Sequence, residues 1–590
     1  MQNFTDEEVN LAEQPSHPIP DPAIPSNLYR ADRSLQRLLR RYLRNKPLEW
    51  NWTEDFLAEW GGICARQVEP LVETADKNGP TLKQFNRRGE RVDELVYHPA
   101  YHEIGKLVYG FGLAGMSNQP GFRGLDRPAS QLVKFAAMYL FDQVEGSISC
   151  PVSMTDTLAR VLNTYAAPQL IDMYLPRLTS QDYGQLYTGA MFMTEKTGGS
   201  DVGATTTVAV ANEEWWELSG GKWFCSNVGA DLILTLARPE GAVAGTRGLS
   251  LFLIPRILPD GEPNSYLINR LKDKLGTRAM ASGEVTFQST KAYLIEPLDR
   301  GFVMMMEMVN GTRLHSGVAG AAVLRRSVIE ATLHGKERKA FGLPLAEQPL
   351  YADRLADMIV DSDAATALFL ETAYRLDKSD QNQSADDRIL SRLLISLLKR
   401  YATDHGVKAA QTAMEMRGGN GYIEDWPNAR LLRDAYVQII WEGGINMVAF
   451  DVLRTLERDN AWHIYAAALQ AELAGINSPG LNTPVNSLRT CLDLLGREVE
   501  RLMVQPRSIQ EIAAPQLAEA MAALYAAVLL IVQAHDSLIT KDPAAKRDLE
   551  AARRYYTRFL QPILEALKRP ANTGAVHELI EGAIMPEQTT

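Results

Sequence analysis

A single carboxylate stands in an apolar run near residue 440. In "YVQIIWEGGINMVAF" (436–450), Glu442 follows three large apolar side chains and precedes Gly443 and Gly444. Helix interiors rarely hold a lone acid behind such a run, and two glycines are a poor continuation of a helix. A carboxylate kept away from water gains basicity, so an acid in this setting needs an explanation beyond helix formation.

Two glycine-rich stretches have the composition of anion-binding loops. "MTEKTGGSDV" (193–202) places backbone amides beside Thr and Ser hydroxyls, which suits a phosphate or the polar edge of a heterocycle. In "GGNGY" (418–422), the glycines likewise allow an anion to approach the backbone closely. The alternatives are an ordinary turn for the first stretch and a loop between helices for the second.

A third stretch, "GKWFCSNVGADL" (221–232), carries two aromatic residues and a hydroxyl close together. In a regular strand, Trp223 and Cys225 would point to one face and Phe224 and Ser226 to the other. An aromatic ring and a hydroxyl on the same face would cover a flat cofactor ring. The alternative is an ordinary core aromatic residue with a surface serine.

The cysteines and histidines give no indication of metal chemistry. The four cysteines are widely spaced and have no CxxC motif or histidine partner at metal-binding spacing, which predicts reduced thiols. His98 and His102 are four residues apart, but "HPAYH" lacks the acidic residue of a zinc motif. We therefore expect no metal site.

The overall composition predicts a globular protein with several domains. A chain of 590 residues exceeds what one ordinary core supports, which predicts two to four domains. The start of the chain resembles neither a secretory signal nor a transit peptide. The longest apolar stretch, "MAALYAAVLLIVQAHD", is too short to span a membrane. These features predict a cytoplasmic protein with no membrane span.

Hydrophobic periodicity divides the chain into five segments that must position the motifs. They are a Pro-rich arm and basic helix (1–50), a helical domain (51–185), a strand domain (186–297), a helical bundle that contains Glu442 (298–456), and an extra helical domain (457–590). The bundle is expected to be antiparallel, because a polar insert, "DKSDQNQSADD", separates two of its helices.

The net charge of −11 argues against a general polyanion-binding surface. A basic helix expected at 30–46 carries seven basic residues, and a solvated charged face is its simplest interpretation. Contact with nucleic acid or with a neighbouring subunit is the alternative. Residues 460–590 hold 12 basic and 14 acidic residues, so Arg553, Arg554 and Arg558 form only a local cluster.

The order of the motifs matches a known family. "MTEKTGGSD", "KWFCSN", "KDKLGTRAMASGEVTF", "RKAFGLPL", "MRGGNGY", "RLLRDA" and "WEGG" follow one another within residues 50–455. In this order they resemble the acyl-CoA dehydrogenase flavoprotein family. "FNRRGERVDELVYHPAYH" (85–102), "EGSISCPVSMT" (145–155) and the helical extension are similar to its AidB-like branch.

The resemblance implies an α+β fold that is mainly α. Its parts are an N-terminal helical domain, a middle β-barrel-like domain, a C-terminal four-helix bundle and an extra helical extension. Arg338, Phe341 and Gln348 resemble residues that hold the FAD of a neighbouring subunit, and Gly418 and Gly419 resemble backbone contacts on that same dinucleotide. A cofactor shared across an interface requires at least a dimer, and family members are usually tetramers.

FAD is the cofactor that the resemblance implies. Thr194 matches the residue at the pyrimidine edge of the flavin, and Ser226 matches the hydroxyl near its hydride-accepting nitrogen. Phe224 takes the place of the usual Trp against the isoalloxazine, with Trp223 beside it, so either ring is a candidate. The implied cofactor-binding positions are Met193, Thr194, Gly199, Ser200, Phe224, Ser226, Arg338, Phe341, Gln348, Glu415, Gly418, Gly419 and Gly444.

Two positions depart from the family pattern. Gly444 stands where relatives often have a Thr that contacts FAD, so that contact is lost. Glu415 replaces a Gln and places an acid near phosphate, which is unfavourable unless the acid is paired. Both differences are expected to weaken FAD binding without altering the fold.

The implied function is that of an FAD-dependent acyl-CoA dehydrogenase. Glu442 matches the base that removes the α-proton of the thioester while a β-hydride passes to the flavin, giving the 2,3-enoyl-CoA. The implied substrate-binding positions are Ser200, Arg313, Trp441 and Gly443. For Arg313, whose family counterpart lies near the base and the CoA portion, a surface salt bridge is the alternative.

Two other functions stay open. One is an acyl-CoA-binding or stress-response flavoprotein with weak turnover. The other is association with DNA through the basic helix or the C-terminal arginines. The acyl chain length and the electron acceptor do not follow from the sequence.

Overall fold

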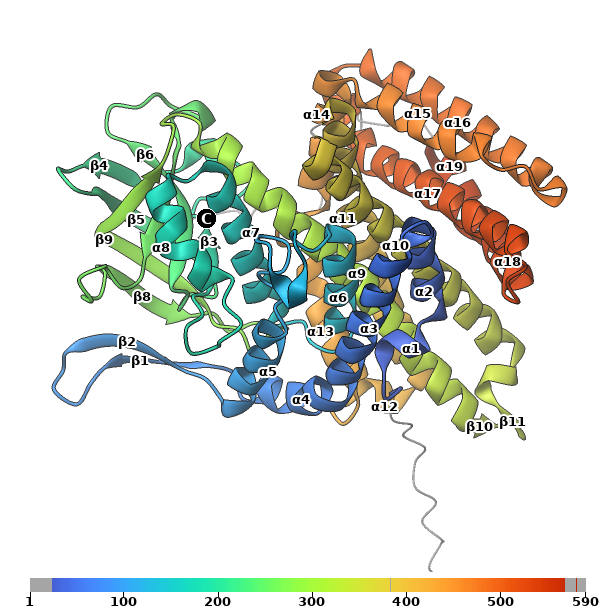
Figure 1. Ribbon diagram of the computed structural model, residues 1–590, viewed down its shortest axis with the longest axis horizontal. Coiled ribbons are helices and arrows are strands. Elements are labelled where there is room, and N and C mark those ends of the chain that lie inside the picture. The colour runs from blue at the N-terminus through green and yellow to red at the C-terminus, as the bar shows by residue number, and fades with distance from the viewer. Residues whose placement is uncertain (1–23, 383, 568–579, 581–590) are drawn as a thin grey trace, which may run out of the picture.

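A computed structural model describes residues 24–382, 384–567 and 580 of the chain. The expected order of helices, strands and helices is confirmed, and helices dominate the structure (Figure 1). In this view, the strand domain lies on the left, the long bundle helices cross the centre, and the last helices lie at the upper right. Most of the Pro-rich arm lies outside the described residues.

The helices of the first domain contribute much of the main core. They are α1 (Leu28–Ala31), α2 (Arg33–Leu43), α3 (Pro47–Ile63), α4 (Glu69–Lys77), α5 (Pro99–Gly110), α6 (Gln131–Asp142), α7 (Ser149–Tyr165) and α8 (Pro168–Leu178). All twelve residues of α6 are buried, so this helix is enclosed on every side. A helix enclosed in this way is expected to be apolar around most of its circumference, as "LVKFAAMYLF" is.

This domain also contains a β-hairpin, although only helices and turns were predicted for residues 51–185. β1 (Thr81–Phe85) and β2 (Arg91–Val96) pair antiparallel, and the hairpin projects from the body below the strand domain (Figure 1). Its side chains cover a strand edge: the backbone N–H of Ile268 donates to Asp93 Oδ2 at 2.9 Å, and Gln84 Nε2 donates to the Ile268 carbonyl at 3.1 Å. The hairpin therefore ties the first domain to the strand domain.

The strand domain is barrel-like, as expected. Its strands are β3 (Gly189–Phe192), β4 (Val208–Ala211), β5 (Trp216–Ser226), β6 (Leu232–Pro239), β7 (Ser250–Pro255), β8 (Tyr266–Leu271) and β9 (Ser282–Ile295). β6 pairs with both β4 and β7, and β5 and β9 complete the ring, while β3 and β8 add to its edges. β7 is buried at every residue, which accounts for the apolar run "LFLIP" that follows Ser250.

The alternation expected for residues 223–226 was wrong. The pairing of β5 with β9 shifts register between Lys222 and Cys225, so two β5 residues, Trp223 and Phe224, lie opposite a single β9 residue, Glu284. A bulge of this kind breaks the simple in–out pattern of a strand. Lys222 and Cys225 both point into the protein, whereas Trp223 is half-buried and Phe224 is exposed.

The bundle consists of long helices that pack around α9. Its helices are α9 (Gly301–Glu337), α10 (Pro349–Asn382), α11 (Ala385–Arg417), α12 (Gly419–Tyr422), α13 (Pro427–Gln438) and α14 (Ile445–Asp459). α13 and α14 both pack on α11 and share the fourth position of the bundle. Glu442, Gly443 and Gly444 lie in the break between the end of α13 and the start of α14.

The extension adds α15 (Ala461–Ala474), α16 (Asn482–Met503), α17 (Arg507–Ile539), α18 (Ala545–Tyr555) and α19 (Gln561–Leu567). α17 packs against α10, α11 and α14 of the bundle. By length and composition, α17 could cross a membrane, whereas its apolar stretch was expected to be too short. However, 94% of its apolar window is buried inside the protein, as in a core helix.

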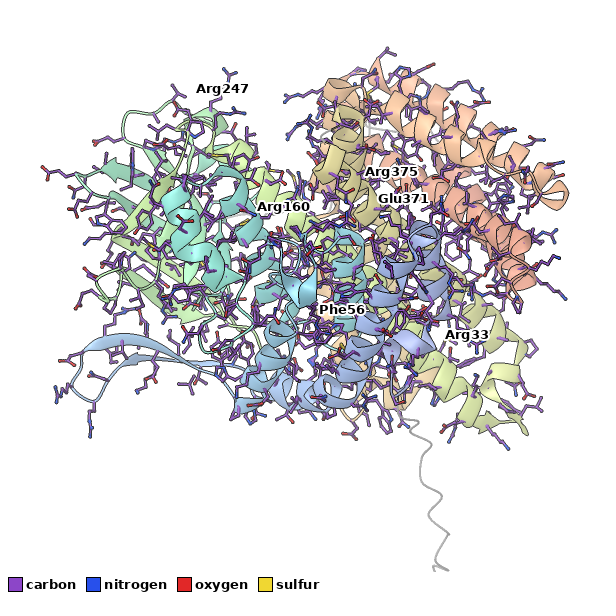
Figure 2. All side chains as sticks on the ribbon, viewed as in Figure 1. Arg33, Phe56, Arg160, Arg247, Glu371 and Arg375 are labelled. Atoms are coloured by element: carbon purple, nitrogen blue, oxygen red, sulfur yellow. The ribbon has the colours of Figure 1, made fainter. Side chains whose placement is uncertain are left out.

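The basic helix α2 is only partly a solvated face: Arg33 and Arg40 are exposed, whereas two other arginines form ion pairs with the extension. Arg41 pairs with Glu472 of the extension, and Arg37 pairs with Asp548 at 3.1 Å. Close by, Glu371 of α10 accepts a hydrogen bond from Tyr525 of the extension. Glu371 also pairs with Arg375, one turn later on the same helix, and Figure 2 labels Glu371 and Arg375. α2 and the extension are thus held together by ion pairs, which leaves fewer of these arginines for contact with DNA.

Candidate active site

Glu442 lies in the short turn between α13 and α14. Its backbone φ is +57°, in the left-handed region that side chains other than glycine rarely adopt, and Gly443 follows at +93°. A glycine accepts such a φ without steric cost, which accounts for the first glycine of the pair. Gly444 has an ordinary φ of −60°, so the backbone conformation does not require the second.

Three protein groups oppose the effect of burial on the Glu442 carboxyl. Its Oε2 accepts a hydrogen bond from Thr312 Oγ1 at 2.8 Å, and its backbone carbonyl accepts one from Arg313 Nε at 3.0 Å. Burial raises the pKa of Glu442 above its usual range, while Thr312 and the cations Lys399 and Arg313 act in the lowering direction. The result is a carboxylate of increased basicity that is held in a fixed orientation.

Arg313 is buried, so its interpretation as a surface residue was wrong. Only 6% of it is exposed, and its Nη1 pairs with Asp451 of α14 at 3.2 Å. Together with its bond to the Glu442 carbonyl, this pairing makes Arg313 a bridge from α9 to both sides of the turn. Its expected contact with substrate stays a prediction.

Trp441 and Gln438 form a second anchor for the same turn. The amide oxygen of Gln438 accepts hydrogen bonds from Ser316 Oγ and from Trp441 Nε1, each at 2.9 Å. Because Ser316 lies on α9, one turn after Thr312, successive turns of α9 hold the segment from 438 to 442 at two points. The sequence motif "NGTRLHSG" (310–317) contains both Thr312 and Ser316, but only Arg313 was assigned a role in it.

Cys150 connects the turn to the strand domain. The pKa of the Cys150 thiol is raised to about 12 by burial and by the charge of Glu442, while Lys274 and the Ser226 hydroxyl act in the opposite direction. Ser226 and Glu442 therefore both lie near this one small thiol. Cys150 lies within "EGSISCPVSMT", and its position inside that motif was the available signal.

A buried ion pair holds the first glycine-rich loop to β5. Glu195 Oε1 pairs with Lys222 Nζ at 2.9 Å, and the Glu195 carboxylate also accepts hydrogen bonds from the hydroxyls of Thr206 and Thr207, each at 2.6 Å. The pKa of Glu195 is lowered to about 2, since these contacts together outweigh burial. This network fixes Thr194, the residue before Glu195, in front of β5.

The two aromatic rings of β5 have different surroundings. Lys272 Nζ lies 3.4 Å from the centroid of the Trp223 ring, and Lys196 Nζ lies 5.5 Å from it. Trp223 also lines a groove of about 310 Å³ together with Glu195 and Lys196. Phe224 is 57% exposed and does not line that groove.

The remaining residues of the first loop are accessible. Ser200 and Gly199 are exposed, and Met193 and Thr194 are half-buried. A Cβ atom on Gly199 would lie 2.6 Å from Thr194 Oγ1, so a side chain there would displace the threonine hydroxyl. The loop therefore keeps its hydroxyls and backbone open, as a site for a polar ligand requires.

A second group of predicted residues lies at the far end of α9. Arg338 ends that helix, and Gln348 Nε2 donates to the Ala340 carbonyl at 3.0 Å, which braces the hairpin of β10 (Lys339–Ala340) and β11 (Leu343–Pro344). Phe341 at the hairpin turn is 98% exposed.

Gly418 and Gly419, the glycines of the second loop, lie in open space where α11 ends and α12 begins. Gly418 has a φ of +70°, and neither it nor Gly419 has an atom within 4 Å of an added Cβ. Glu415 is paired with Arg354 at 2.9 Å and accepts from Gln411, and its pKa is lowered mainly by the bond from Arg354. An acid near phosphate was expected to be unfavourable unless it was paired, and Glu415 is paired.

The two groups of residues are far apart within one chain. Thr312 and Arg338 are separated by 26 positions of one continuous helix and its end. At 1.5 Å per residue this amounts to roughly 39 Å. The chain thus brings Glu442, Ser226, Arg313 and Trp441 together but leaves Arg338, Phe341 and Gln348 at the opposite end of the bundle.

His98 and His102, which follow the β1–β2 hairpin, have structural roles. His98 Nδ1 accepts from the Ala100 N–H at the start of α5, and His102 contacts the Tyr183 hydroxyl. Elsewhere among the described residues, Asp404, His405 and Glu519 lie close enough to share a cation. Arg400 already pairs with both of those carboxylates, at 3.3 and 3.0 Å.

Four family descriptions match successive parts of the chain. They are the AidB N-terminal domain of adaptive response proteins (19–185), the acyl-CoA dehydrogenase middle domain (190–290), the acyl-CoA dehydrogenase C-terminal domain (299–456) and a domain like the C-terminal domain of acyl-CoA dehydrogenase 11 (460–578). Together they extend over all the expected segments from the basic helix onward.

Similar proteins cover most of the chain. Acyl-CoA dehydrogenase family member 11 of Caenorhabditis elegans is 32% identical over 91% of this chain and 88% of its own length. The putative acyl-CoA dehydrogenase AidB of Escherichia coli (strain K12) is 31% identical over 81% of this chain and 88% of its own. The crystal structure of C. elegans ACDH-11 in complex with C11-CoA superposes with a TM-score of 0.83 at 30% identity, covering 92% of this chain and 93% of that one. The chain belongs to the acyl-CoA dehydrogenase family, on its AidB-like branch.

Proposed function

We propose that the protein is an FAD-dependent acyl-CoA dehydrogenase in which Glu442 removes the α-proton of an acyl-CoA thioester and the 2,3-enoyl-CoA is formed. The observation that carries this proposal is the Glu442 carboxyl, whose pKa is raised by burial and which is fixed by Thr312 and Arg313 at a break between helices. The α-proton of a thioester is too weakly acidic for water to remove at a useful rate, so a base of increased strength is required.

The chain's own residues supply the base and its orientation. Thr312 holds one carboxylate oxygen of Glu442, which leaves the other oxygen for the proton. Arg313 fixes the backbone of the same residue, so the carboxylate cannot turn away from its target. The buried Cys150 thiol and Ser226 lie on the side toward the strand domain.

The residues in place fit FAD. When bound, FAD would supply a hydride acceptor for the β-carbon. Of the two candidate rings, Phe224 is favoured for contact with the isoalloxazine, because it is 57% exposed whereas Trp223 is half-buried. Lys272 lies over both rings and is closer to Trp223, at 3.4 Å against 4.8 Å. Thr194 and Ser226 would bond the flavin edge, and Ser200 with the neighbouring amides would hold its phosphates.

The distance along α9 supports a cofactor shared between two copies of the chain. Arg338, Phe341 and Gln348 lie roughly 39 Å along the helix from the level of the base. A dinucleotide bound at Ser226 of one copy would therefore be held at its adenosine end by the hairpin of another. We propose a homo-oligomer, a dimer at least and a tetramer by resemblance, in which the exposed Phe341 ring is covered.

The proposal is tested by anaerobic mixing of the FAD-loaded protein with acyl-CoA esters of increasing chain length. Bleaching of the oxidised flavin absorbance is the expected result. Glu442→Gln should keep its flavin and lose the bleaching, whereas Glu498→Gln, which alters only an exposed pair with Arg501, should behave like the wild type. Wild-type protein that no ester bleaches would contradict the proposal.

A second candidate, an acyl-CoA-binding flavoprotein with weak turnover, is favoured by one observation. The Thr that relatives use to contact FAD is absent at Gly444, so the cofactor has one contact fewer than in a typical relative. Tight binding of an acyl-CoA by calorimetry, combined with negligible turnover in the presence of a dye acceptor, would support this second function over the first.

A further inference from the structure

Lys399 is a buried cation beside the base. It lies on α11, is 2% exposed, and donates from its ammonium to the backbone carbonyl of Gln438. A buried ammonium is costly unless a hydrogen bond and an opposite charge compensate its loss of water. The carbonyl supplies the hydrogen bond, and the nearby Glu442 supplies the charge.

Close packing of two helices lets α11 reach this position. A Cβ atom on Gly317 of α9 would lie 2.7 Å from Leu398 Cγ. One on Gly320 would lie 2.6 Å from the backbone of Ala402. Any larger residue at these positions would push α11 away from α9 and from the turn that α9 holds.

The carbonyl that Lys399 binds is the starting point of the turn that carries the base. Gln438 is the last residue of α13, and Glu442 follows four residues later with its left-handed φ. The C-terminal carbonyls of a helix carry partial negative charge and have no partner within the helix, so they favour a cation. Lys399 satisfies this carbonyl from one side while Ser316 and Trp441 hold the Gln438 side chain from the other.

The charges around Lys399 come from several elements. Glu442 of the turn raises the pKa of Lys399, whereas burial and Arg313 of α9 lower it, to about 7. Asp451 of α14 pairs with Arg313 and so reduces the repulsion between the two cations. Arg392 of α11 pairs with the same Asp451 at 3.2 Å. On the strand-domain side, the Cys150 thiol interacts with both Glu442 and Lys274.

We propose that Lys399 is a positioning residue for the base: it fixes the end of α13 that precedes Glu442 and keeps the Glu442 carboxyl ionised. The inference rests on the proposed function, in which Glu442 accepts the α-proton. Lys399 itself touches no substrate in this assignment. Its effect is exerted through the Gln438 carbonyl and through its charge.

The first test compares Lys399→Met and Lys399→Arg by the pH dependence of flavin reduction in the FAD-loaded protein. Loss of the cation raises the pKa of Glu442, so the pH below which the rate falls should move up by about one unit in Lys399→Met. Lys399→Arg retains the charge and should keep the profile close to that of the wild type. Lys408→Met, at an exposed position of the same helix that pairs with Asp404, is the matched control and should not move it.

A merely structural role would lower the rate or the flavin content of both variants without shifting the profile. An unshifted Lys399→Met profile, or equal shifts in the Met and Arg variants, would overturn the proposal.

A second measurement is independent of whether Lys399→Met folds. In protein labelled with ¹³C at lysine Cε, the Lys399 resonance is identified by its loss in Lys399→Arg and is titrated in the wild type and in Glu442→Gln. Removal of the anion should lower the Lys399 midpoint by about one pH unit. An unchanged midpoint would overturn the proposal. This titration requires no turnover, so it separates failure of this inference from a wild type that no acyl-CoA reduces.

Discussion

The hydroxyl of Thr312 donates to Oε2 of Glu442 across 2.8 Å, although 130 positions separate the two residues in sequence. This bond joins the longest helix of the bundle to the only described turn in which a carboxylate with left-handed backbone is followed by two glycines. It fixes the carboxylate and stabilises its charged form, so it affects both the direction and the strength of the proposed base.

Thr312→Val removes that bond and keeps the shape of the side chain. A hydrogen bond to a charged group contributes about 1.5 to 3 kcal/mol, so its loss should raise the pKa of Glu442 by about one unit or more. The pH below which flavin reduction slows should therefore move upward. Stopped-flow measurement of the reduction rate against pH checks this, with Thr412→Val as a control whose hydroxyl bonds only within α11. An unshifted profile would show that the bond does not control the base.

Gly444→Thr should restore the missing contact to FAD. Gly444 has a φ of −60°, and an added Cβ would have only the Ile439 carbonyl nearby, at 3.9 Å, so the side chain fits without strain. One hydrogen bond contributes about 1 kcal/mol, which corresponds to a roughly fivefold lower Kd for FAD. Fluorescence titration of the apoprotein measures this change. Gly444→Val has the same shape without the hydroxyl, and an equal gain in that variant would refute the explanation.

Lys222→Met should destabilise the strand domain strongly, because it leaves Glu195 buried without its cation. Breaking a buried pair in this way typically costs about 3 to 5 kcal/mol in the free energy of unfolding. Urea unfolding followed by circular dichroism measures the loss. Lys83→Met breaks an exposed pair with Glu94 and should cost less than about 1 kcal/mol. Equal costs for the two variants would contradict the assignment.

The same pair predicts a pH dependence in the wild type. The pKa of Glu195 is lowered to about 2 from an ordinary value of 4.5, so its contribution to stability is complete above about pH 4.5. It should be lost as pH falls from there toward about 2. Lys222→Met raises the pKa of Glu195 and should therefore unfold with a weaker dependence on pH across that window.

Arg41→Glu should loosen the extension from the rest of the protein. Arg41 pairs with Glu472, and the acid Glu371 lies close by, so a reversed charge would repel both. Limited proteolysis should then cut the connection between α15 and α16 faster than in the wild type. Arg40→Glu alters an exposed neighbour that stacks on Trp50 and should leave the cleavage rate nearly unchanged. If both variants are cut equally fast, the ion pair does not hold the extension.

The sequence alone was enough to predict the order of the domains and the identity of the proposed base. Hydrophobic periodicity distinguishes helices from strands because each side chain's direction follows from its place in a local repeat. The order of the motifs then identified the family, and the isolation of Glu442 among apolar residues marked it as unusual. Each motif and each repeat is encoded within a few neighbouring residues, and their order is read directly along the chain.

What only the tertiary structure decided were the partners of charged groups and the places where a local repeat breaks. α2 looked like a solvated face because nothing in its own sequence indicates that Glu472 and Asp548 pack against it. The bulge before Cys225 depends on how β9 pairs with β5, and it breaks the alternation expected for the residues around it. Thr312 and Lys399 reach Glu442 through the packing of α9 and α11, and such contacts depend on the three-dimensional approach of segments that are distant in the chain.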